Sequence, residues 1–319
     1  MSSREAIAGE LAWIDGRFLS RGELVLPVGD AGFVFGATVT EQLRTIRGRL
    51  FLLDEHLARL RASLAVVGIE PSWSTAVIGE AATAVASHNH ALAAAAGGPA
   101  PGPDLGLVVF VTPGDLAAQH EGRGGPPRVV IHTFPLAFGL WADAYDRGVA
   151  LRTVGTRQVP EACWPIHAKV RSRLHYHLAD REAHAAEPGA RAILEHLDGR
   201  ISETSTANIA VVTDGAIAVP PPADALAGVS LGFVRQLAER LGIPWHERSL
   251  RAADLAAADE ILLTSTPNCI LPATRFNGRA VGTGMPGPVY RRLLDAWSAD
   301  VGLDIAGQAR SRRPAAAKA

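Results

Sequence analysis

Among the residues that could do chemistry, one lysine stands apart. The chain of 319 residues has 31 lysines and arginines, of which only Lys169 and Lys318 are lysines, and Lys318 is next to last. Arginine keeps its proton in proteins, whereas a lysine amine can lose its proton and attack a carbonyl carbon. A single internal lysine therefore indicates Schiff-base chemistry at Lys169. The alternative is a chance lysine on a helix surface.

The residues that follow Lys169 favour the first interpretation. Lys169 begins the amphipathic stretch KVRSRLHYHLADREA, in which Leu174 and Leu178 mark one face and arginines and histidines crowd the lysine. Positive neighbours favour the neutral form of an amine, and this is the form that attacks a carbonyl. The stretch supplies such neighbours.

A carboxylate lies downstream of the lysine. In LDGRISETSTANIAVV, an Asp-Gly turn at 198–199 leads to Glu203 and then to Asn208, just ahead of an apolar strand. The spacing predicts Glu203 at the edge of a strand. Because glutamate is rarely buried without a partner, a solvated surface residue is the ordinary interpretation of Glu203 taken alone.

Three further regions could hold an anion. The segment LAGVSLGFVRQLAERLG places Gly228, Val229 and Ser230 at the head of a predicted helix, where free backbone N–H groups suit a phosphate. Thr266 follows the apolar run EILL and could donate a hydroxyl. Arg59 lies across a predicted helix from its apolar stripe and faces either solvent or a groove. Each also has a simpler interpretation, as a cap, a turn residue or a surface arginine.

The first half of the chain must position these side chains with hairpins and helices. An Asp-Gly dipeptide at 15–16 and an Arg-Gly dipeptide at 47–48 each separate two short β-like runs and predict hairpins. A helix is predicted over 54–68, with Asp54 as N-cap and Gly68 as C-terminal stop. Its expected apolar stripe consists of Leu57, Leu60, Leu64 and Val67.

The rest of the chain indicates mixed α and β structure. A second helix is predicted around 74–95, and the runs GLVVFVT and RVVIHTF predict two strands. Further strands alternate with helices at about 170–186, 230–242 and 288–299. The expected fold class is therefore α/β, of the α+β type.

Length and composition predict two domains. A chain of this length is about twice the usual size of a domain. We place an N-terminal α/β domain at 1–140 and a C-terminal α/β domain, which carries Lys169, at 141–302. A low-complexity loop at 95–105 and a polar tail at 303–319 are expected to be mobile and disordered, respectively.

Composition also narrows the class of protein. Hydrophobic residues make up 48% and charged residues 20%, and no apolar run reaches the roughly 20 residues that span a bilayer. The first residues lack the pattern of a secretory signal, so the expected location is the cytoplasm. Cys163 and Cys269 do not have the spacing of a zinc site, and we expect no metal. Acidic and basic residues balance, which makes nucleic acid an unexpected partner.

Taken in order, these segments resemble the class IV, or fold type IV, pyridoxal-phosphate enzymes. This family contains branched-chain and D-amino-acid aminotransferases and aminodeoxychorismate lyase. The resemblance runs from about residue 11 to residue 300. It rests on DAGFVFGATVTEQLRTIRGRLFLLDEHLARLRASL, on the spacing of Lys169 and Glu203, on LAGVS, and on STPNCILPATRFNGRAVGTGMPGP.

The resemblance implies a role for each candidate residue. Lys169 would form the Schiff base with pyridoxal 5'-phosphate, and Glu203 would pair with the pyridine nitrogen. The residues implied at the cofactor phosphate are Arg59, Val229, Ser230 and Thr266, and Gly228 is a further implied cofactor-binding residue. The implied fold has two α/β domains with the cofactor between them.

Three positions depart from the family pattern. Branched-chain enzymes have a tyrosine five residues after the lysine, where this chain has Leu174, although Tyr176 lies nearby. Pro113 precedes a glycine where other members have an arginine for the substrate carboxylate. Thr40 precedes Glu41 where the family often has a bulky aromatic residue, which predicts a more open or more polar pocket. Candidates for the substrate pocket are Phe35, Thr40 and Thr112.

The function implied is a transaminase that acts on an amino acid or a primary amine through Lys169, with a small-molecule amino donor and a carbonyl acceptor. An alternative is elimination of pyruvate, as in aminodeoxychorismate lyase. A third possibility is a non-catalytic relative that still binds pyridoxal phosphate. The resemblance also implies a homodimer.

Overall fold

The computed structural model describes residues 7–96 and 103–313, and the chain divides into two units. The first unit comprises Met1–Leu136 and Ala168–Ser172, and the second comprises Ala137–His167 and Arg173–Ala319. The division falls close to the boundary expected near residue 140. A short segment around Lys169, however, belongs to the first unit, although the sequence places it in the C-terminal domain.

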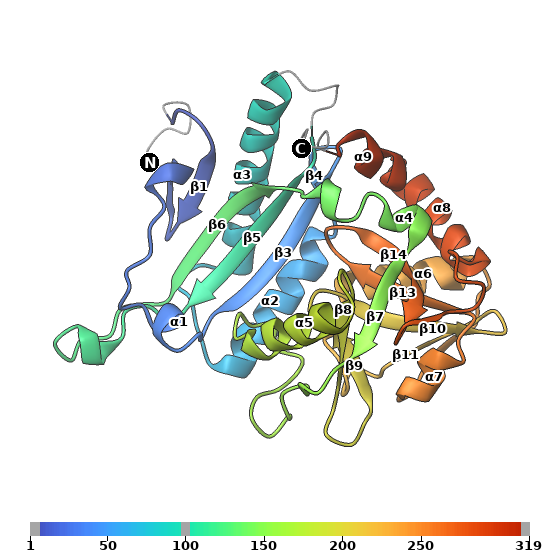
Figure 1. Ribbon diagram of the computed structural model, residues 1–319. Coiled ribbons are helices and arrows are strands. Elements are labelled where there is room, and N and C mark those ends of the chain that lie inside the picture. Colours follow the sequence, from blue (N-terminus) through green and yellow to red (C-terminus); the bar gives the residue numbers. More distant parts are fainter. Residues whose placement is uncertain (1–6, 97–102, 314–319) are drawn as a thin grey trace. The chain divides into compact units, whose positions relative to one another are not determined.

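The first unit is built on a six-stranded sheet in the order β2-β1-β6-β5-β3-β4. All its strand pairs are antiparallel. Helices α2 and α3 cover one face of the sheet (Figure 1). The elements are β1 (Leu11–Ile14), β2 (Arg17–Ser20), α1 (Ala31–Val34), β3 (Val39–Ile46), β4 (Arg49–Leu50), α2 (Leu53–Val67), α3 (Thr75–Ala95), β5 (Leu105–Thr112) and β6 (Arg128–Pro135).

Both predicted hairpins form, and their turn residues explain why. Asp15 and Gly16 between β1 and β2 have φ values of 46° and 85°, and Arg47 and Gly48 between β3 and β4 have φ values of 52° and 78°. Two successive residues with positive φ make the two-residue turn whose twist matches that of the flanking strands. The hairpin predictions are confirmed.

Helix α2 differs from its prediction in how it starts and in the face that it buries. Its N-cap is Leu52, in a left-handed conformation, and Asp54 lies within the first turn. Val67, expected in the apolar stripe, is 40% exposed, whereas His56 and Ser63 are buried together with Leu60 and Leu64. The stripe prediction considered only apolar residues, and it failed because buried polar residues with hydrogen-bond partners occupy part of this face.

The two faces of the first sheet have separate apolar clusters. On the helix side, Val39, Leu43 and other strand residues pack against α2 and α3. On the opposite face, Val108, Phe110 and Val130 form a smaller cluster. Adjacent residues of β5 divide between the two clusters, as the alternation of side chains along a strand requires.

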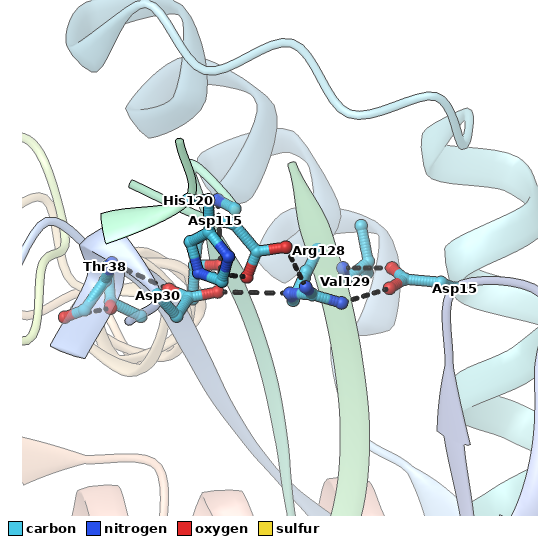
Figure 2. A network of polar contacts seen from close by, with 10 residues as sticks. Asp15, Asp30, Thr38, Asp115, His120, Arg128 and Val129 are labelled. Atoms are coloured by element: carbon cyan, nitrogen blue, oxygen red, sulfur yellow. Dashed lines mark hydrogen bonds and ion pairs between the residues drawn. The ribbon is translucent and has the colours of Figure 1, made fainter. Parts of the chain in front are cut away.

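Arg128, at the start of β6, links three connections of the first unit (Figure 2). Its guanidinium lies 2.7 Å from Asp115 in the β5–β6 loop, 3.3 Å from Asp30 before α1, and 3.9 Å from Asp15 in the first hairpin turn. The charge of Asp115 and its hydrogen bond raise the pKa of Arg128 above its usual value. One cation thereby holds together loops that are far apart in sequence.

The second unit contains a nine-stranded mixed sheet, in the order β12-β11-β10-β13-β14-β7-β8-β9 with β15 beside β14. The pairs β14–β7, β7–β8 and β11–β12 are parallel. The strands are β7 (Val149–Thr153), β8 (Arg191–Glu195), β9 (Ile201–Thr204), β10 (Asn208–Thr213), β11 (Ala216–Val219), β12 (Trp245–Glu247), β13 (Glu260–Ser265), β14 (Cys269–Phe276) and β15 (Arg279–Ala280).

Helices of the second unit pack on this sheet. The buried face of α6 includes Val234 and Leu237, and α5 packs through Ala179 and Ala183 against β8. The linker-like segment before β7 contains the short helix α4. The helices are α4 (Ala144–Arg147), α5 (Leu174–Ala186), α6 (Val229–Arg240), α7 (Ala252–Ala256), α8 (Pro288–Val301) and α9 (Ile305–Ser311).

Two expectations for the second half need correction. The helix expected from about residue 170 begins at Leu174, so Lys169 is not helical. The tail expected to be disordered from residue 303 forms α9, in which Ile305, Ala306 and Ala309 are buried. The side-chain oxygen of Asp304 caps this helix by accepting from Gly307 N at 2.8 Å. Residues 314–319 of the tail, and 97–102 of the loop at 95–105, lie outside the described residues.

Candidate active site

Lys169 lies in an extended segment that pairs with the start of β3 in the first sheet. Thr40 N donates to Lys169 O at 3.0 Å, and Arg171 N donates to Thr38 O at 2.9 Å. These two bonds flank the antiparallel bridge between Val39 and Val170. Main-chain hydrogen bonds therefore fix the backbone around the lysine on the edge of β3.

Side chains from neighbouring elements also hold this segment. Ser63 of α2 accepts a hydrogen bond from Lys169 N at 3.1 Å through Oγ. Ser172 Oγ donates to Gly36 O at 2.8 Å. Val170 packs against the apolar cluster on the helix side of the sheet. A helix, a strand and a loop thus fix the lysine backbone, as precise chemistry requires.

A buried carboxylate pairs with Arg59 on the same unit. Glu41 of β3 accepts hydrogen bonds from Arg59 Nε at 2.7 Å and from Arg59 Nη2 at 2.8 Å. His56 Nδ1 lies 2.7 Å from Glu41 Oε2. The Arg59 side chain is 12% exposed, so this arginine does not simply face solvent. We call Lys169, Glu41, His56 and Arg59 the lysine group.

Charge and burial set the protonation of the lysine group. Burial alone would raise the pKa of Glu41, but the charge of Arg59 and hydrogen bonds from Arg59 and His56 lower it to about 2. Burial lowers the pKa of His56, and the charges of Arg59 and Lys169 act in the same direction, against the attraction of Glu41. Near neutral pH we therefore expect an ionised Glu41 and a neutral His56 that donates through Nδ1.

Glu203 lies in the second unit, on β9, and is 8% exposed. Tyr176 donates a hydrogen bond to Glu203 Oε1 at 2.7 Å, and Asn208 Nδ2 donates to Glu203 Oε2 at 3.0 Å. Because each carboxylate oxygen accepts a protein donor, the orientation of the carboxylate is fixed. The simple interpretation of Glu203 as a solvated surface residue does not hold.

Tyr176 is itself held by its surroundings. Gln158 Nε2 donates to its hydroxyl at 3.1 Å, and the Arg173 guanidinium lies 4.5 Å from the centroid of its ring. Burial and the charge of Glu203 raise the pKa of Tyr176 well above its usual value, so the hydroxyl keeps its proton. Burial and the charge of Arg173 lower the pKa of His175 to about 4.

The predicted helix head forms at the start of α6 and adjoins Asn208. Gly228 is the N-cap, no side chain caps the helix, and Ser230 is buried in its first turn. Asn208 Nδ2 donates to Leu226 O at 2.8 Å, just before the helix. We call Glu203, Tyr176, Asn208 and the helix head at 228–230 the glutamate group.

Thr266 lies in the turn between β13 and β14 and is half-buried. Asn208 pairs with Thr264 across β10 and β13, so Thr266 leaves the end of β13 at which the glutamate group lies. The neighbouring Ser265 donates to Asn268 Oδ1 at 2.9 Å. Thr266 therefore lies just beyond the end of β13 that pairs with Asn208.

The three candidates for the substrate pocket have different surroundings within the first unit. Phe35 is exposed at the end of α1. Thr40 is buried and donates to Val109 O at 3.2 Å. Thr112 is buried and donates to Asp30 Oδ2 at 2.8 Å, which ties it to the network around Arg128. The hydroxyls of both threonines thus have protein acceptors.

Sequence reasoning named as candidates Lys169, Arg59, Glu203 and the helix head at 228–230, and it missed other residues of the two groups. Glu41 was noted only for the residue before it, Tyr176 only as a neighbour of Leu174, and His56 not at all. The missed signal lies in the order of polar residues along α2: His56 and Arg59 are three apart and so share a helix face. The sequence of α2 alone does not show that His56 and Arg59 are buried, because their partner, Glu41, lies on β3.

Comparison with known proteins identifies the family. Residues 38–276 match the family model described as amino-transferase class IV. The chain belongs to the class IV aminotransferases. This confirms the family resemblance, and the mixed two-sheet fold is that of the family.

The aminotransferase is similar to its relatives over most of their length. It is 30% identical to a D-alanine aminotransferase of Bacillus licheniformis over 285 residues, which covers 88% of this chain and 94% of the relative. The branched-chain amino acid aminotransferase of Escherichia coli superposes with a TM-score of 0.81 at 25% identity and covers 92% of this chain and 94% of that one.

A second solved structure includes a cofactor derivative. The branched-chain amino acid aminotransferase of T.th., complexed with N-(5'-phosphopyridoxyl)-L-glutamate, superposes with a TM-score of 0.80 at 25% identity. It covers 93% of this chain and 95% of that one. Within residues 7–96 and 103–313, no helix is long and apolar enough to cross a membrane, and no group of three or more His, Cys, Asp or Glu residues could hold a metal ion.

Proposed function

We propose that this class IV aminotransferase moves amino groups from an amino acid or primary amine to a carbonyl acceptor, using pyridoxal 5'-phosphate bound covalently at Lys169. The observation that carries this proposal is the position of Lys169, on a segment that β3 and α2 hold in place, in a chain of this family. The buried, oriented Glu203 supplies the second group that such chemistry needs.

The residues of the two groups fit the cofactor by their chemistry. Lys169 supplies an amine for the aldehyde carbon, and Glu203 a carboxylate for the ring nitrogen. The uncapped N–H groups at the head of α6, together with Ser230, Thr266 and Arg59, are donors suited to a phosphate dianion.

The chain's residues have distinct tasks in this proposal. When bound, pyridoxal phosphate withdraws the electrons left on the substrate carbon that loses a proton. Glu203 would keep the ring nitrogen protonated, and Tyr176 and Asn208 hold the carboxylate that would do so. The amine of Lys169 would take the proton from the substrate carbon and later give it back. Glu41 holds Arg59 by its Nε and Nη2 edge.

Amino transfer is favoured over the alternatives considered from sequence. The relatives named above are aminotransferases, and elimination of pyruvate is not favoured by these comparisons. A non-catalytic relative would not need an ionisable lysine fixed by backbone hydrogen bonds beside a buried ion pair. D-Alanine and branched-chain amino acids are the first donors to test, because the relatives carry those names.

A donor and acceptor panel tests the proposed function. The holoenzyme is mixed with D- and L-amino acids and primary amines, without acceptor, and loss of the visible absorption of the lysine-bound cofactor is followed. A 2-oxo acid is then added to restore this absorption. We expect a donor that passes both steps, no signal from Lys169→Ala, and full activity from the control Lys318→Ala. Pyruvate release that continues over many turnovers without an acceptor, or no response to any donor, would contradict the proposal.

We further propose a homodimer. Between β2 and β3, several large apolar side chains are exposed, a pattern that in a folded chain marks an interaction surface. They are Val25 at 75%, Val28 at 81%, Phe33 at 73% and Phe35 at 64% exposure. The Arg128 network fixes Asp30 in the middle of this segment, so the apolar residues are presented on a held loop.

We also propose that the enzyme works in the cytoplasm. Cys163 is an exposed free thiol, and exposed thiols are typical of reducing compartments.

A further inference from the structure

A cavity in the second unit lies between α6 and the strands β11 and β12, at the edge of the nine-stranded sheet. Its volume is about 180 Å³. It adjoins the glutamate group at Asn208 and Gly228, but neither Glu203 nor Ser230 lines it, so the carboxylate and the hydroxyl proposed for the cofactor lie outside it. The side chains of its wall are mostly apolar, and they include Val219, Pro220, Pro222, Leu226, Leu231 and Trp245.

The indole of Trp245 forms one wall, on the face of β12 that α6 covers. Glu247 accepts a hydrogen bond from Arg235 Nη1 of α6 at 2.9 Å, so the Glu247 side chain points to the helix. Because side chains two residues apart along a strand share a face, Trp245 points the same way. On α6, a Cβ atom added to Gly232, which also lines the cavity, would meet no atom within 4 Å. This glycine therefore leaves space open beside the helix.

The indole N–H of Trp245 lacks an acceptor in the protein. Its Nε1 is buried and has no hydrogen-bond partner among the residues that the structure describes. An indole N–H can only donate, and buried tryptophans usually find an acceptor. A buried water needs about two to four polar partners, which mostly apolar walls do not supply. An acceptor atom on a bound molecule would satisfy this N–H.

The charges beside the cavity disfavour an anion. Arg235 Nε donates to Glu239 Oε1 at 3.2 Å, and Arg235 Nη1 donates to Glu247 Oε1 at 2.9 Å. Two carboxylates thus share one guanidinium, and the local charge is negative. A carboxylate or phosphate on a ligand would be repelled here, whereas a neutral acceptor would not.

From these features we propose that the cavity between α6 and β12 is a binding site for a neutral molecule of one ring, with an oxygen that accepts from Trp245 Nε1. An apolar cavity of about 150 Å³ holds a benzene ring, so this cavity has room for a ring and a short substituent. Amino acids and 2-oxo acids carry a carboxylate and do not match it. The site is therefore additional to amino transfer at Lys169 and does not depend on it.

The indole N–H signals in NMR test the site directly. The chain has six tryptophans, and Trp245→Phe identifies the signal of Trp245 by removing it. The probes are benzamide, which is neutral, and benzoate, which has the same shape and a negative charge. We expect benzamide to move the Trp245 signal of the holoenzyme to saturation, with a dissociation constant on the order of 1 mM. Benzoate should bind there at least about 10-fold more weakly.

Trp245→Phe removes the donor and keeps an aromatic ring, so ligand-observed NMR on this variant measures what the N–H contributes. Benzamide should bind about five-fold more weakly or worse, whereas toluene, which has no acceptor, should bind as it does to the wild type. Trp141→Phe is the matched control. Trp141 Nε1 is also buried without a partner in the described part of the chain, but Trp141 does not line this cavity. This control should bind benzamide as the wild type does.

Gly232→Leu supplies a second variant, in which the indole is intact. A leucine side chain in the open space should weaken benzamide binding about 10-fold and reduce the movement of the Trp245 signal. An unmoved Trp245 signal in the wild type, or equal benzamide affinity in the wild type and Trp245→Phe, would overturn the proposal, as would tighter binding of benzoate. If Trp245→Phe does not fold, unchanged benzamide binding by Gly232→Leu overturns it instead.

Discussion

At the scale of single residues, Glu41 shows how a carboxylate stays ionised inside the first unit. Burial opposes its charge, but Arg59 on one edge and His56 on the other lower its pKa to about 2. The arrangement also restrains the arginine that we propose for the cofactor phosphate.

The lysine group should make the enzyme sensitive to acid. Glu41 has a folded pKa below its usual 4.5, so its contribution to stability is present above pH 4.5 and is lost as the pH falls toward 2. His56 has a folded pKa below its usual 6.5, so protonation of the unfolded chain costs stability as the pH falls below 6.5. The full Glu41 contribution is about 3 kcal/mol.

Urea unfolding between pH 7 and pH 3 measures this effect. We expect the midpoint to fall on acidification, and Glu41→Gln to have a lower midpoint at pH 7 and a shallower dependence between pH 5 and pH 3. Glu55→Gln, which changes an exposed carboxylate of α2, is the control and should behave as the wild type. Equal slopes for Glu41→Gln and the wild type would show that Glu41 does not titrate as proposed.

At the scale of elements, the junction of α6 and β10 joins the helix head to the carboxylate. A Cβ atom on Gly228 would overlap Asn208 Oδ1, so no larger residue fits there unless Asn208 moves. Asn208 in turn donates to Glu203. A change at the N-cap of α6 should therefore reach Glu203 through one side chain.

Gly228→Ala and Gly232→Ala test this coupling as a matched pair. Gly232 lies inside α6 with no atom near the position of an added Cβ, so alanine there should stabilise the protein by about 0.5–1 kcal/mol and leave cofactor binding unchanged. Gly228→Ala should raise the dissociation constant of pyridoxal phosphate about 10-fold or more, because it disturbs both Asn208 and the N–H groups that we propose for the cofactor phosphate. Equal cofactor affinity in the two variants would contradict the coupling.

Local sequence patterns predicted most helices and strands. The wrong predictions arise where residues pair with partners that are far away in the chain. Dipeptides with positive φ determine the hairpins at 15–16 and 47–48, and the periods of α3, α6 and α8 are visible in the sequence. Lys169 was expected on a helix because the stretch after it is amphipathic. It is extended because its neighbours pair with β3, which lies far away in the chain.

The candidate site was predictable only through the resemblance. Glu203 and the helix head could be named from sequence, but Tyr176 and Asn208 become partners of Glu203 only when β9, β10 and α5 come together. In the same way, nothing local marks Glu41 as the partner of Arg59. Residue type and order predict which groups are present, whereas hydrogen-bond partners depend on the tertiary fold.

At the scale of the whole molecule, the exposed apolar segment between β2 and β3 bears on assembly. Replacing Val28 and Phe33 by serine removes apolar area from that surface without touching the core, so we expect the dimer to dissociate more readily. Sedimentation velocity over a range of concentrations measures this, with Leu197→Ser, an exposed leucine of the second unit, as control. A monomeric wild type, or an unaffected double variant, would refute this surface as the interface.

The most direct test of the whole account is to locate the cofactor chemically. The chain has only two lysines, so reduction of the holoenzyme with borohydride, digestion and mass spectrometry give a clear assignment. We predict a single phosphopyridoxyl group, on the peptide that contains Lys169, and none on Lys169→Ala. Label on Lys318, or no label on a protein that binds pyridoxal phosphate, would contradict the account.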